Sequence, residues 1–145
     1  MDTKLLVIVL CLMVTVSWTQ DDQCKEGKRC RKFFQYTINN QLQKPYFRSS
    51  INLRVYPFVR MIRYMEEAVL INPEGFINFR ANFTSPYGYY VDTIHLLTEA
   101  YKVNKTYWQI SNSSGPLDVG VSSYKPVPGD KILFNFTQGG HCGRN

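Results

Sequence analysis

Apolar residues between positions 57 and 71 recur with the spacing of an α-helix. The stripe consists of Phe58, Ile62, Met65 and Val69, with Met61 and Ala68 beside it. Such a stripe is typical of a helix with one buried face. Pro57 suits the first helical turn, where its missing donor is of no consequence, and the turn Asn72-Pro73-Glu74-Gly75 ends the pattern. The sequence therefore predicts one long helix over Pro57–Ile71.

The rest of the chain shows the shorter periodicity of β-strands. Aromatic and branched residues form runs, some alternating with polar residues, that Gly, Pro and Asn separate. The predicted strands are Phe33–Leu42, Ile51–Val55, Phe76–Phe83, Tyr89–Ile94, Lys105–Ile110 and Lys131–Phe136. One helix packed on a small, mostly antiparallel or mixed sheet is an α+β fold. We expect it to be β-grasp-like, with the sheet wrapping the helix.

The first residues have the pattern of a secretion signal. Lys4 precedes the apolar run Leu5–Val16, and Ser17 or Thr19 offers a small residue for cleavage. The run is too short to cross a bilayer of about 30 Å, so no transmembrane segment is expected. The chain divides into a secretion signal (1–19), a basic Cys-containing segment (20–32), one folded domain (33–138) and a Gly-rich tail (139–145). We predict a secreted, extracellular protein.

Positive charge gathers just after the predicted signal. The formal net charge is +6 at pH 7, and the cluster consists of Lys25, Lys28, Arg29, Arg31 and Lys32. Such a cluster could attract acidic glycans or a membrane surface, or it could be the solvated flank of a secreted domain. No nucleic-acid motif accompanies it, so nucleic acid is not an expected partner.

Three cysteines follow the predicted signal, which itself contains Cys11. An oxidising secretory route would act on Cys24, Cys30 and Cys142. Cys30 and Cys142 flank the first and last predicted strands and could join the termini if those strands are neighbours, whereas Cys24 and Cys30 could close a local loop. Either pairing leaves one thiol, for an intermolecular bond or for a buried free state, so a disulfide-linked dimer is a possible form.

Sequons predict a glycoprotein. The candidate glycosylation sites are Asn82, Asn104, Asn112 and Asn135, each followed two residues later by Ser or Thr. If they carry glycans, they must face solvent, which restricts any binding surface to the part of the domain that lies away from them.

The sequence offers little catalytic chemistry. Its imidazoles are His95, which suits a surface or core position, and His141 in the Gly-rich tail. It contains no Cys-x-x-Cys, no His pair at helical spacing and no phosphate-binding glycine loop. Glu66 and Glu67 are adjacent on the predicted helix and face different directions, which does not suit paired acid and base catalysis. We predict a protein without catalytic activity and without a metal site.

The stretch from Tyr87 to Val121 is the richest in aromatic residues. It combines several tyrosines and a tryptophan with glycines and turn signals. Flat apolar surface with hydroxyl and indole groups, close to exposed backbone, suits a large planar ligand. The alternative is that these aromatics are strand residues of a small core.

The order of several motifs resembles a known family. The motifs are Tyr36-Thr37-Ile38-Asn39-Asn40-Gln41-Leu42, Glu66-Glu67-Ala68, Asn72-Pro73, Gly88 after an aromatic residue, Lys105-Thr106-Tyr107-Trp108-Gln109, Pro116-Leu117, Gly120-Val121, Tyr124-Lys125-Pro126 and Phe134 to Gln138. Together they are similar to the small C-terminal domain of the transcobalamin, haptocorrin and intrinsic factor family of vitamin B12 carriers. The resemblance covers about Phe33 to Gln138.

The resemblance implies a ligand and its contacts. In that family the small domain covers one face of cobalamin, which lies between it and a large helical barrel. The matching positions are Tyr87, Gly88, Tyr89, Tyr107, Trp108 and Leu117, which we take as candidate cobalamin-binding residues. Gly88 would allow close approach of the backbone to the ligand. Trp108 suits a core position equally well.

The sequence also departs from the family pattern. The helical barrel is not found between the predicted signal and the small domain, and Pro86-Tyr87 stands where the family usually has Ser-Trp. The resemblance implies a secreted, cobalamin-binding or vitamin B12 transport protein, with a second chain or a receptor as partner. The alternative is a secreted protein-interaction or signalling module that keeps the fold without the vitamin. In a third reading, the basic start is a host-defence or glycan-binding patch.

Overall fold

The computed structural model describes residues 32–84, 86 and 88–139. Its elements are β1 (Phe33–Asn40), β2 (Phe47–Arg54), α2 (Met61–Ile71), β3 (Phe79–Thr84), β4 (Gly88–Ile94), β5 (Leu97–Thr98), α3 (Tyr101–Asn104), β6 (Thr106–Asn112), β7 (Gly115–Pro116) and β8 (Lys131–Gln138). The predicted signal, most of the basic segment, all three cysteines of the mature chain and Tyr87 lie outside the described residues.

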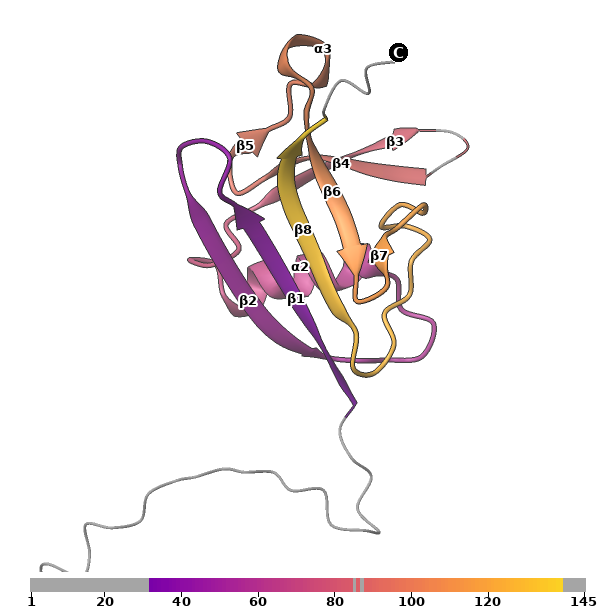
Figure 1. The fold of residues 1–145 in the computed structure, drawn as a ribbon. Coiled ribbons are helices and arrows are strands. Elements are labelled where there is room, and N and C mark those ends of the chain that lie inside the picture. The colour runs from indigo at the N-terminus through magenta and orange to yellow at the C-terminus, as the bar shows by residue number, and fades with distance from the viewer. Residues whose placement is uncertain (1–31, 85, 87, 140–145) are drawn as a thin grey trace, which may run out of the picture. The chain divides into compact units, whose positions relative to one another are not determined.

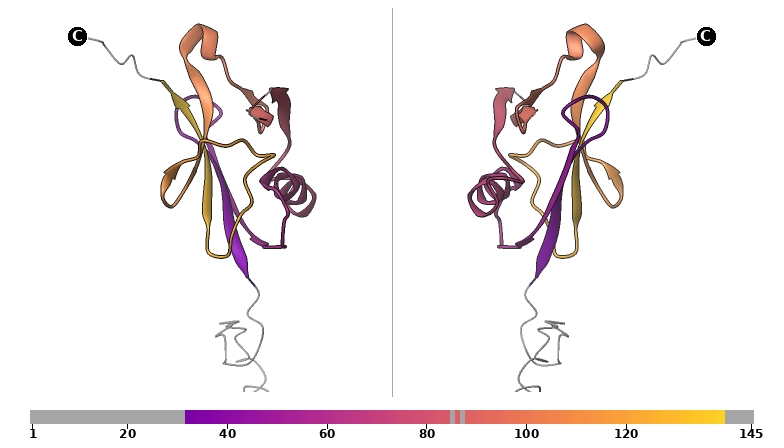
Figure 2. Two further views of the ribbon diagram at one scale, coloured as in Figure 1. Left: turned by 90° about the vertical axis from the view of Figure 1, so that its right-hand side faces the viewer. Right: turned by 90° about the vertical axis from the view of Figure 1, so that its left-hand side faces the viewer.

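The strands form two sheets of unequal size. The larger sheet has the order β2-β1-β8-β6-β7, and the smaller has the order β3-β4-β5. The larger sheet is mixed, because β1 runs antiparallel to β2 but parallel to β8. Helix α2 and the smaller sheet lie on the same face of the larger sheet (Figures 1 and 2). The prediction of a helix on a mostly antiparallel or mixed sheet is confirmed in outline. The second sheet was not predicted, and the β-grasp arrangement stays a prediction.

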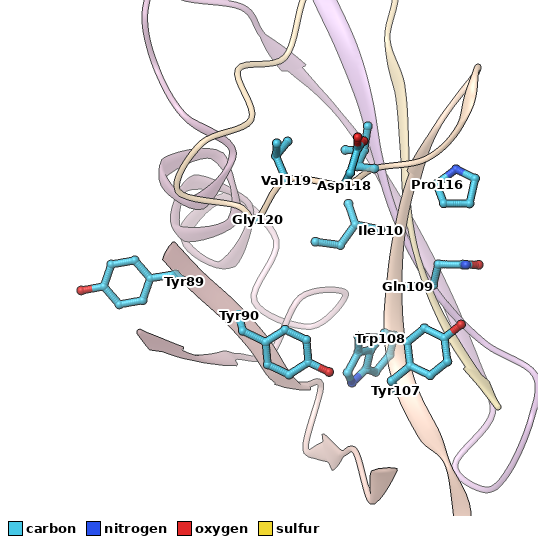
Figure 3. A pocket seen from close by; sticks show the side chains of 11 residues that line it. Tyr89, Tyr90, Tyr107, Trp108, Gln109, Ile110, Pro116, Asp118, Val119 and Gly120 are labelled. Carbon is cyan, nitrogen blue, oxygen red and sulfur yellow. The ribbon is translucent and has the colours of Figure 1, made fainter. Parts of the chain in front are cut away.

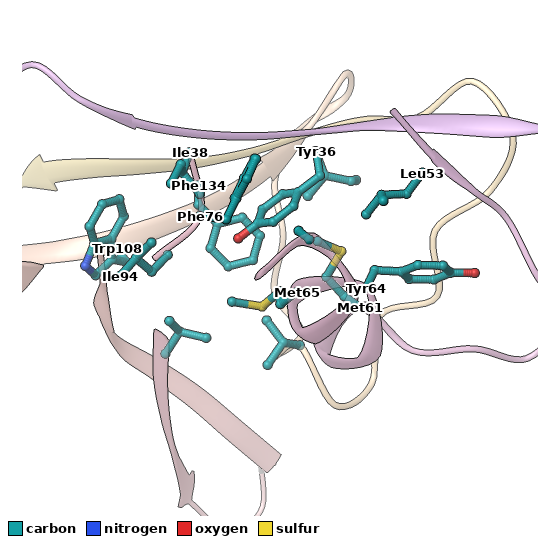
Figure 4. Packing of buried hydrophobic residues seen from close by; sticks show 14 of the residues in the cluster. Tyr36, Ile38, Leu53, Met61, Tyr64, Met65, Phe76, Ile94, Trp108 and Phe134 are labelled. Atoms are coloured by element: carbon teal, nitrogen blue, oxygen red, sulfur yellow. The ribbon is translucent and has the colours of Figure 1, made fainter. Parts of the chain in front are cut away.

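The core fills the space between the larger sheet and the elements on that face (Figure 4). Alternate residues of β1 and β8 point into it, among them Tyr36 and Phe134, whose ring centroids lie 5.3 Å apart at an interplanar angle of 75°. Phe76 packs against Tyr36 from the other side at 5.1 Å. Burial raises the pKa of the Tyr36 phenol. These aromatic contacts and the burial of the apolar face hold the sheet and the helix together.

Helix α2 begins four residues later than the pattern predicts. Phe58 is not on the buried face, because it has a φ of 64° and is 86% exposed. The N–H groups of Met61 and Ile62 instead bond to the carbonyl oxygens of Tyr124 (2.9 Å) and Val121 (3.1 Å). These contacts satisfy donors that a helix N-terminus leaves free, so the loop around residues 121–124 fixes where the helix starts.

The buried stripe of α2 also differs from the predicted one. It consists of Met61, Tyr64, Met65 and Ala68. Tyr64 was not predicted to be buried, because the predicted stripe began at Phe58 and did not include position 64. Its ring meets Phe34 edge to face at 4.9 Å, and its hydroxyl accepts a bond of 2.7 Å from the Tyr56 N–H. The helix ends as predicted, with the N–H of Asn72 bonded to the Ala68 carbonyl.

Strand β1 ends at Asn40 rather than at the predicted Leu42. The Asn40 side chain is fully buried, donates to the carbonyl oxygens of Gln43 (2.7 Å) and Pro45 (2.6 Å), and accepts from the Leu42 N–H (3.1 Å). This side chain therefore takes the place of ladder partners and organises the turn into β2. Strand β2 begins at Phe47, earlier than predicted, and β5, β7 and α3 were not predicted.

Strands β1 and β8 are neighbours, as a bridge between the termini would require, but they run parallel. The N–H of Gly129 bonds to the Phe33 carbonyl at 2.8 Å, so the start of β1 lies beside the residues that lead into β8 and at the opposite end of the sheet from Gln138. Cys24, Cys30 and Cys142 lie outside the described residues, so both candidate pairings stay predictions.

Candidate functional site

A pocket of about 310 Å³ opens between the two sheets. Strand β4 forms one wall, strand β6 the other, and the segment after β7 closes the end (Figure 3). The lining residues are Tyr89, Tyr90, Tyr107, Trp108, Gln109, Ile110, Pro116, Leu117, Asp118, Val119 and Gly120. Most of these side chains are aromatic or aliphatic, which is typical of a site for an organic ligand.

The wall formed by β6 is partly an open sheet edge. Strand β7 pairs with β6 only at Ser111 and Asn112. The Ile110 carbonyl accepts a bond of 2.9 Å from the Leu117 N–H, which shows that its polar groups point away from β8. Since this direction alternates along an antiparallel strand, the backbone N–H and C=O of Trp108 point to the same side. No strand among the described residues pairs with them there, and Trp108 lines the pocket.

Tyr90 provides the polar group on the opposite wall. Its side chain is directed toward β6 in Figure 3, and its hydroxyl donates a hydrogen bond to Glu99. Burial, followed by this bond and the charge of Glu99, raises the pKa of the phenol, so the hydroxyl keeps its proton at neutral pH. The same residue also borders a hollow of about 450 Å³ next to α3.

A hydrogen bond joins the β3–β4 hairpin to the loop that follows residues 116–120. The Tyr89 N–H donates a bond of 2.9 Å to the Ser122 hydroxyl. Gly88, beside it, has a φ of 85°, and a Cβ at this position would collide with the Ser122 Oγ. Gly88 is therefore required by the backbone conformation and by the close approach of Ser122. The aromatic ring of Tyr89 points away from β6 (Figure 3) and meets Phe83 edge to face at 5.6 Å.

Trp108 is a core residue in the structure. Its side chain is 3% exposed, its ring lies 5.0 Å from that of Phe136, and its indole N–H donates a bond of 3.1 Å to the Leu97 carbonyl. This bond links β6 to the smaller sheet across the floor of the pocket. The position matches the core alternative that the sequence left open for this residue.

The structure brings most of the candidate residues together. Tyr89, Tyr107, Trp108 and Leu117 all line the pocket, and Gly88 lies beside it. Tyr87 lies outside the described residues. The resemblance pointed to the turn and strand from Tyr87 to Tyr90, but Tyr90 itself was not among the candidate residues. Nothing in the sequence pointed to Ile110 or Asp118.

His95 lies in a strained turn at the end of β4. It has a φ of 54°, and Leu96 after it has a φ of 67°. The imidazole stacks on Phe47 at 4.4 Å, and its Nδ1 is buried without a hydrogen-bond partner. Burial lowers the pKa of this imidazole, against an opposing hydrogen bond to the Gly75 backbone. These contacts indicate a packing role rather than a catalytic one.

The four sequon asparagines differ in exposure. Asn82 and Asn104 are exposed, whereas Asn112 and Asn135 are half-buried. The Asn135 Oδ1 accepts a bond of 2.7 Å from Asn39. Asn104 uses its Oδ1 to accept from the backbone and hydroxyl of Thr106, which leaves its amide nitrogen free for a glycan.

Two further properties were searched for in the described part of the chain. It contains no group of three or more His, Cys, Asp or Glu side chains placed to hold a metal ion. None of its helices has the length and apolar character needed to cross a membrane.

The curated proteins found by sequence comparison are of one kind. No protein-family model matches the chain. Human cobalamin binding intrinsic factor is 37% identical over 105 residues, which are 71% of this chain and 24% of the relative. The dog protein of the same name is 35% identical over the same shares. The chain thus spans about a quarter of the length of the curated relatives it matches.

The fold agrees with the sequence match. A crystal structure of haptocorrin in complex with Cbi superposes with a TM-score of 0.59 and 19% identity, over 74% of this chain and 25% of the haptocorrin chain. A matched quarter of a longer protein is the size expected of one domain. The sequence matches and the fold together support a domain of the type found at the C-terminal end of transcobalamin-family proteins.

Proposed function

We propose that this protein binds cobalamin or another corrinoid, without catalysing a reaction, and that the ligand lies against the pocket between β4, β6 and residues 116–120. The observation that carries the proposal is the convergence of aromatic, aliphatic and open backbone groups on one cavity. The relatives named for cobalamin binding support the choice of ligand. The predicted secretion signal supports an extracellular carrier role.

The chemistry of the pocket suits a corrinoid. The macrocycle is large and flat, and amide side chains surround its rim. Ile110, Leu117 and the ring of Tyr90 offer apolar contact to its edge. The backbone N–H and C=O of Trp108 can donate to and accept from the amides, and the Tyr90 hydroxyl, which donates its proton to Glu99, can accept from them. This division of roles, apolar walls with a few fixed polar groups, is that of most small-molecule sites.

The size of the pocket limits what this domain can do alone. A volume of about 310 Å³ is at the lower end of ligand sites and admits only one edge of a macrocycle. Burial of about 300 Å² of apolar surface would contribute about 7 kcal/mol. Because association costs on the order of 4 to 15 kcal/mol, we propose that a second protein surface completes the site, either a partner chain or a second copy joined through a spare cysteine.

Visible-absorption titration of aquocobalamin with the secreted protein tests this function. We expect a saturable spectral change that Leu117→Asp abolishes, because the carboxylate would enter the apolar wall. Leu70→Asp is the matched control, since Leu70 is 83% exposed on α2, and it should titrate like the parent. No spectral change at high micromolar protein, or equal loss in both variants, would contradict the proposal.

A protein-interaction role is the second candidate. Phe83 is 69% exposed and Tyr89 41% exposed on the hairpin beside the pocket. Exposed paired aromatics of this kind also occur at protein interfaces. Crosslinking in conditioned medium, compared between the parent and Phe83→Ser, would detect such a partner. A partner that is captured equally with and without corrinoid, by a protein that fails the titration, would favour this second role.

A further inference from the structure

Five cationic residues belong to separate segments that meet at the end of the domain where β1 begins. They are Lys32, Arg54, Arg60, Lys125 and Lys131, and all are exposed. The Val55 N–H bonds to the Lys32 carbonyl at 2.7 Å, which brings the end of β2 beside the start of β1. The loops around residues 55–60 and 125–130 both lie at this end of the ribbon (Figures 1 and 2).

Little negative charge offsets these cations. Within the described residues, the ion pairs are Arg63 with Glu66 and Arg80 with Asp92, and neither involves the five cations. Asp130 is the carboxylate nearest in sequence, and it already accepts from the Tyr124 hydroxyl (2.7 Å) and the Val127 N–H (2.9 Å). These donors are neutral, so Asp130 keeps its charge and offsets about one of the five positive charges, which leaves an excess of positive charge at this end.

Aromatic rings lie beneath two of the cations. The Arg54 guanidinium is 5.4 Å from the centroid of Tyr56, and the Lys125 ammonium is 5.8 Å from that of Phe58. Phe58 is held in this exposed place by a backbone conformation that is unfavourable for a bulky residue. The rings thus support and orient the cations at the surface.

The geometry points to a docking surface for a sulfated polysaccharide at this end of the domain, formed by these five cations. Charge complementarity carries the choice of a polyanion. A bilayer suits the surface less well, because inserting Phe58 would draw the Lys125 ammonium into hydrocarbon. The predicted secretion directs the protein to the extracellular space, where sulfated polysaccharides occur. This surface is separate from the corrinoid pocket and shares no residue with it.

Heparin binding by the full secreted chain tests the inference. The test variant is Arg54→Gln/Arg60→Gln/Lys125→Gln. The matched control, Lys44→Gln/Arg48→Gln/Lys102→Gln, removes the same charge from exposed cations of the β1–β2 turn, the start of β2 and α3. Both variants keep the basic segment that precedes Lys32, so that segment cannot account for a difference. Circular dichroism establishes that both variants are folded.

We expect the parent protein to bind heparin at about 0.15 M salt, where surface charges are already partly screened. The test variant should bind about tenfold more weakly, equivalent to about 1.4 kcal/mol, and the control within about twofold of the parent. Equal weakening in the two variants, or no binding by the parent, would overturn the inference. So would tighter binding to duplex DNA of equal charge, or tighter binding to phosphatidylserine vesicles than to heparin that Phe58→Ser abolishes.

Discussion

Replacing Trp108 by Phe tests whether this side chain stabilises the fold around the pocket or contacts the ligand. The indole is buried, and its N–H donates to the Leu97 carbonyl at 3.1 Å. Phenylalanine keeps an aromatic ring against Phe136 but removes that donor. If Trp108 holds β6 to the smaller sheet, the substitution should lower the free energy of unfolding while leaving the ligand-contacting groups of the folded protein in place.

Two effects set the size of the change. Leaving the buried Leu97 carbonyl without its donor costs about 1 to 3 kcal/mol. The smaller ring buries about 40 Å² less apolar surface, which removes about 1 kcal/mol. The expected loss is therefore about 2 to 4 kcal/mol, a large part of the 5 to 15 kcal/mol typical of a whole domain. For a domain of this size, it corresponds to a fall in melting temperature of about 10 °C or more.

Urea denaturation followed by circular dichroism measures the loss. Tyr107→Phe is the control, because Tyr107 is the half-buried neighbour of Trp108 on β6, and it should change the stability by less than about 0.5 kcal/mol. Corrinoid affinity, measured on the folded variant at low temperature, should stay within about threefold of the parent. An unchanged stability would refute the scaffold role, and so would a tenfold loss of affinity in a fully folded variant.

Three further predictions follow from single residues. Gly88→Ala should destabilise the protein by about 1 to 2 kcal/mol through its positive φ alone. Adding Ser122→Ala to the same chain removes the collision with the Ser122 Oγ, but thermal melts should show that it restores only part of the lost stability. Because burial lowers the pKa of His95, protonation favours the unfolded chain, so the free energy of unfolding should be highest above about pH 6.5 and should fall as the pH drops below it. His95→Asn, which tolerates the φ of 54°, should flatten that dependence in urea titrations between pH 7.5 and 5. In protein secreted by cultured cells, Asn104→Gln should remove a glycan and increase gel mobility, whereas Asn135→Gln should leave the mobility unchanged.

The sequence predicted the positions of the helix and the longer strands better than the long-range contacts between them. Periodicity located β1, β4, β6, β8 and the end of α2, because local alternation and a proline turn determine them. It misplaced the start of α2, since the Met61 and Ile62 N–H groups are satisfied by carbonyls some sixty residues away. Such long-range bonds leave no local signal. The short strands β5 and β7 were missed for the same reason, because they exist only through pairing with neighbours.

For the candidate site too, the sequence indicated the stretches of chain but not the contacts between them. The aromatic composition and the resemblance indicated the correct stretches of chain, and the structure brings Tyr107 and Leu117 to one cavity. Neither could indicate that the polar groups of β6 include an open backbone edge, because this depends on where β7 stops pairing. Tyr90 likewise stands out only when its hydroxyl is seen to bond Glu99.

Hydrogen exchange measured by mass spectrometry, with and without excess cyanocobalamin, tests the central claim most directly. The account predicts slower exchange in Thr106–Asn112 and in residues 116–120, because the ligand would cover the open edge of β6. The control is Phe47–Arg54, the strand at the opposite edge of the larger sheet, whose exchange should not change. Slower exchange confined to other segments, or none at any corrinoid concentration, would contradict the claim that this pocket binds the vitamin.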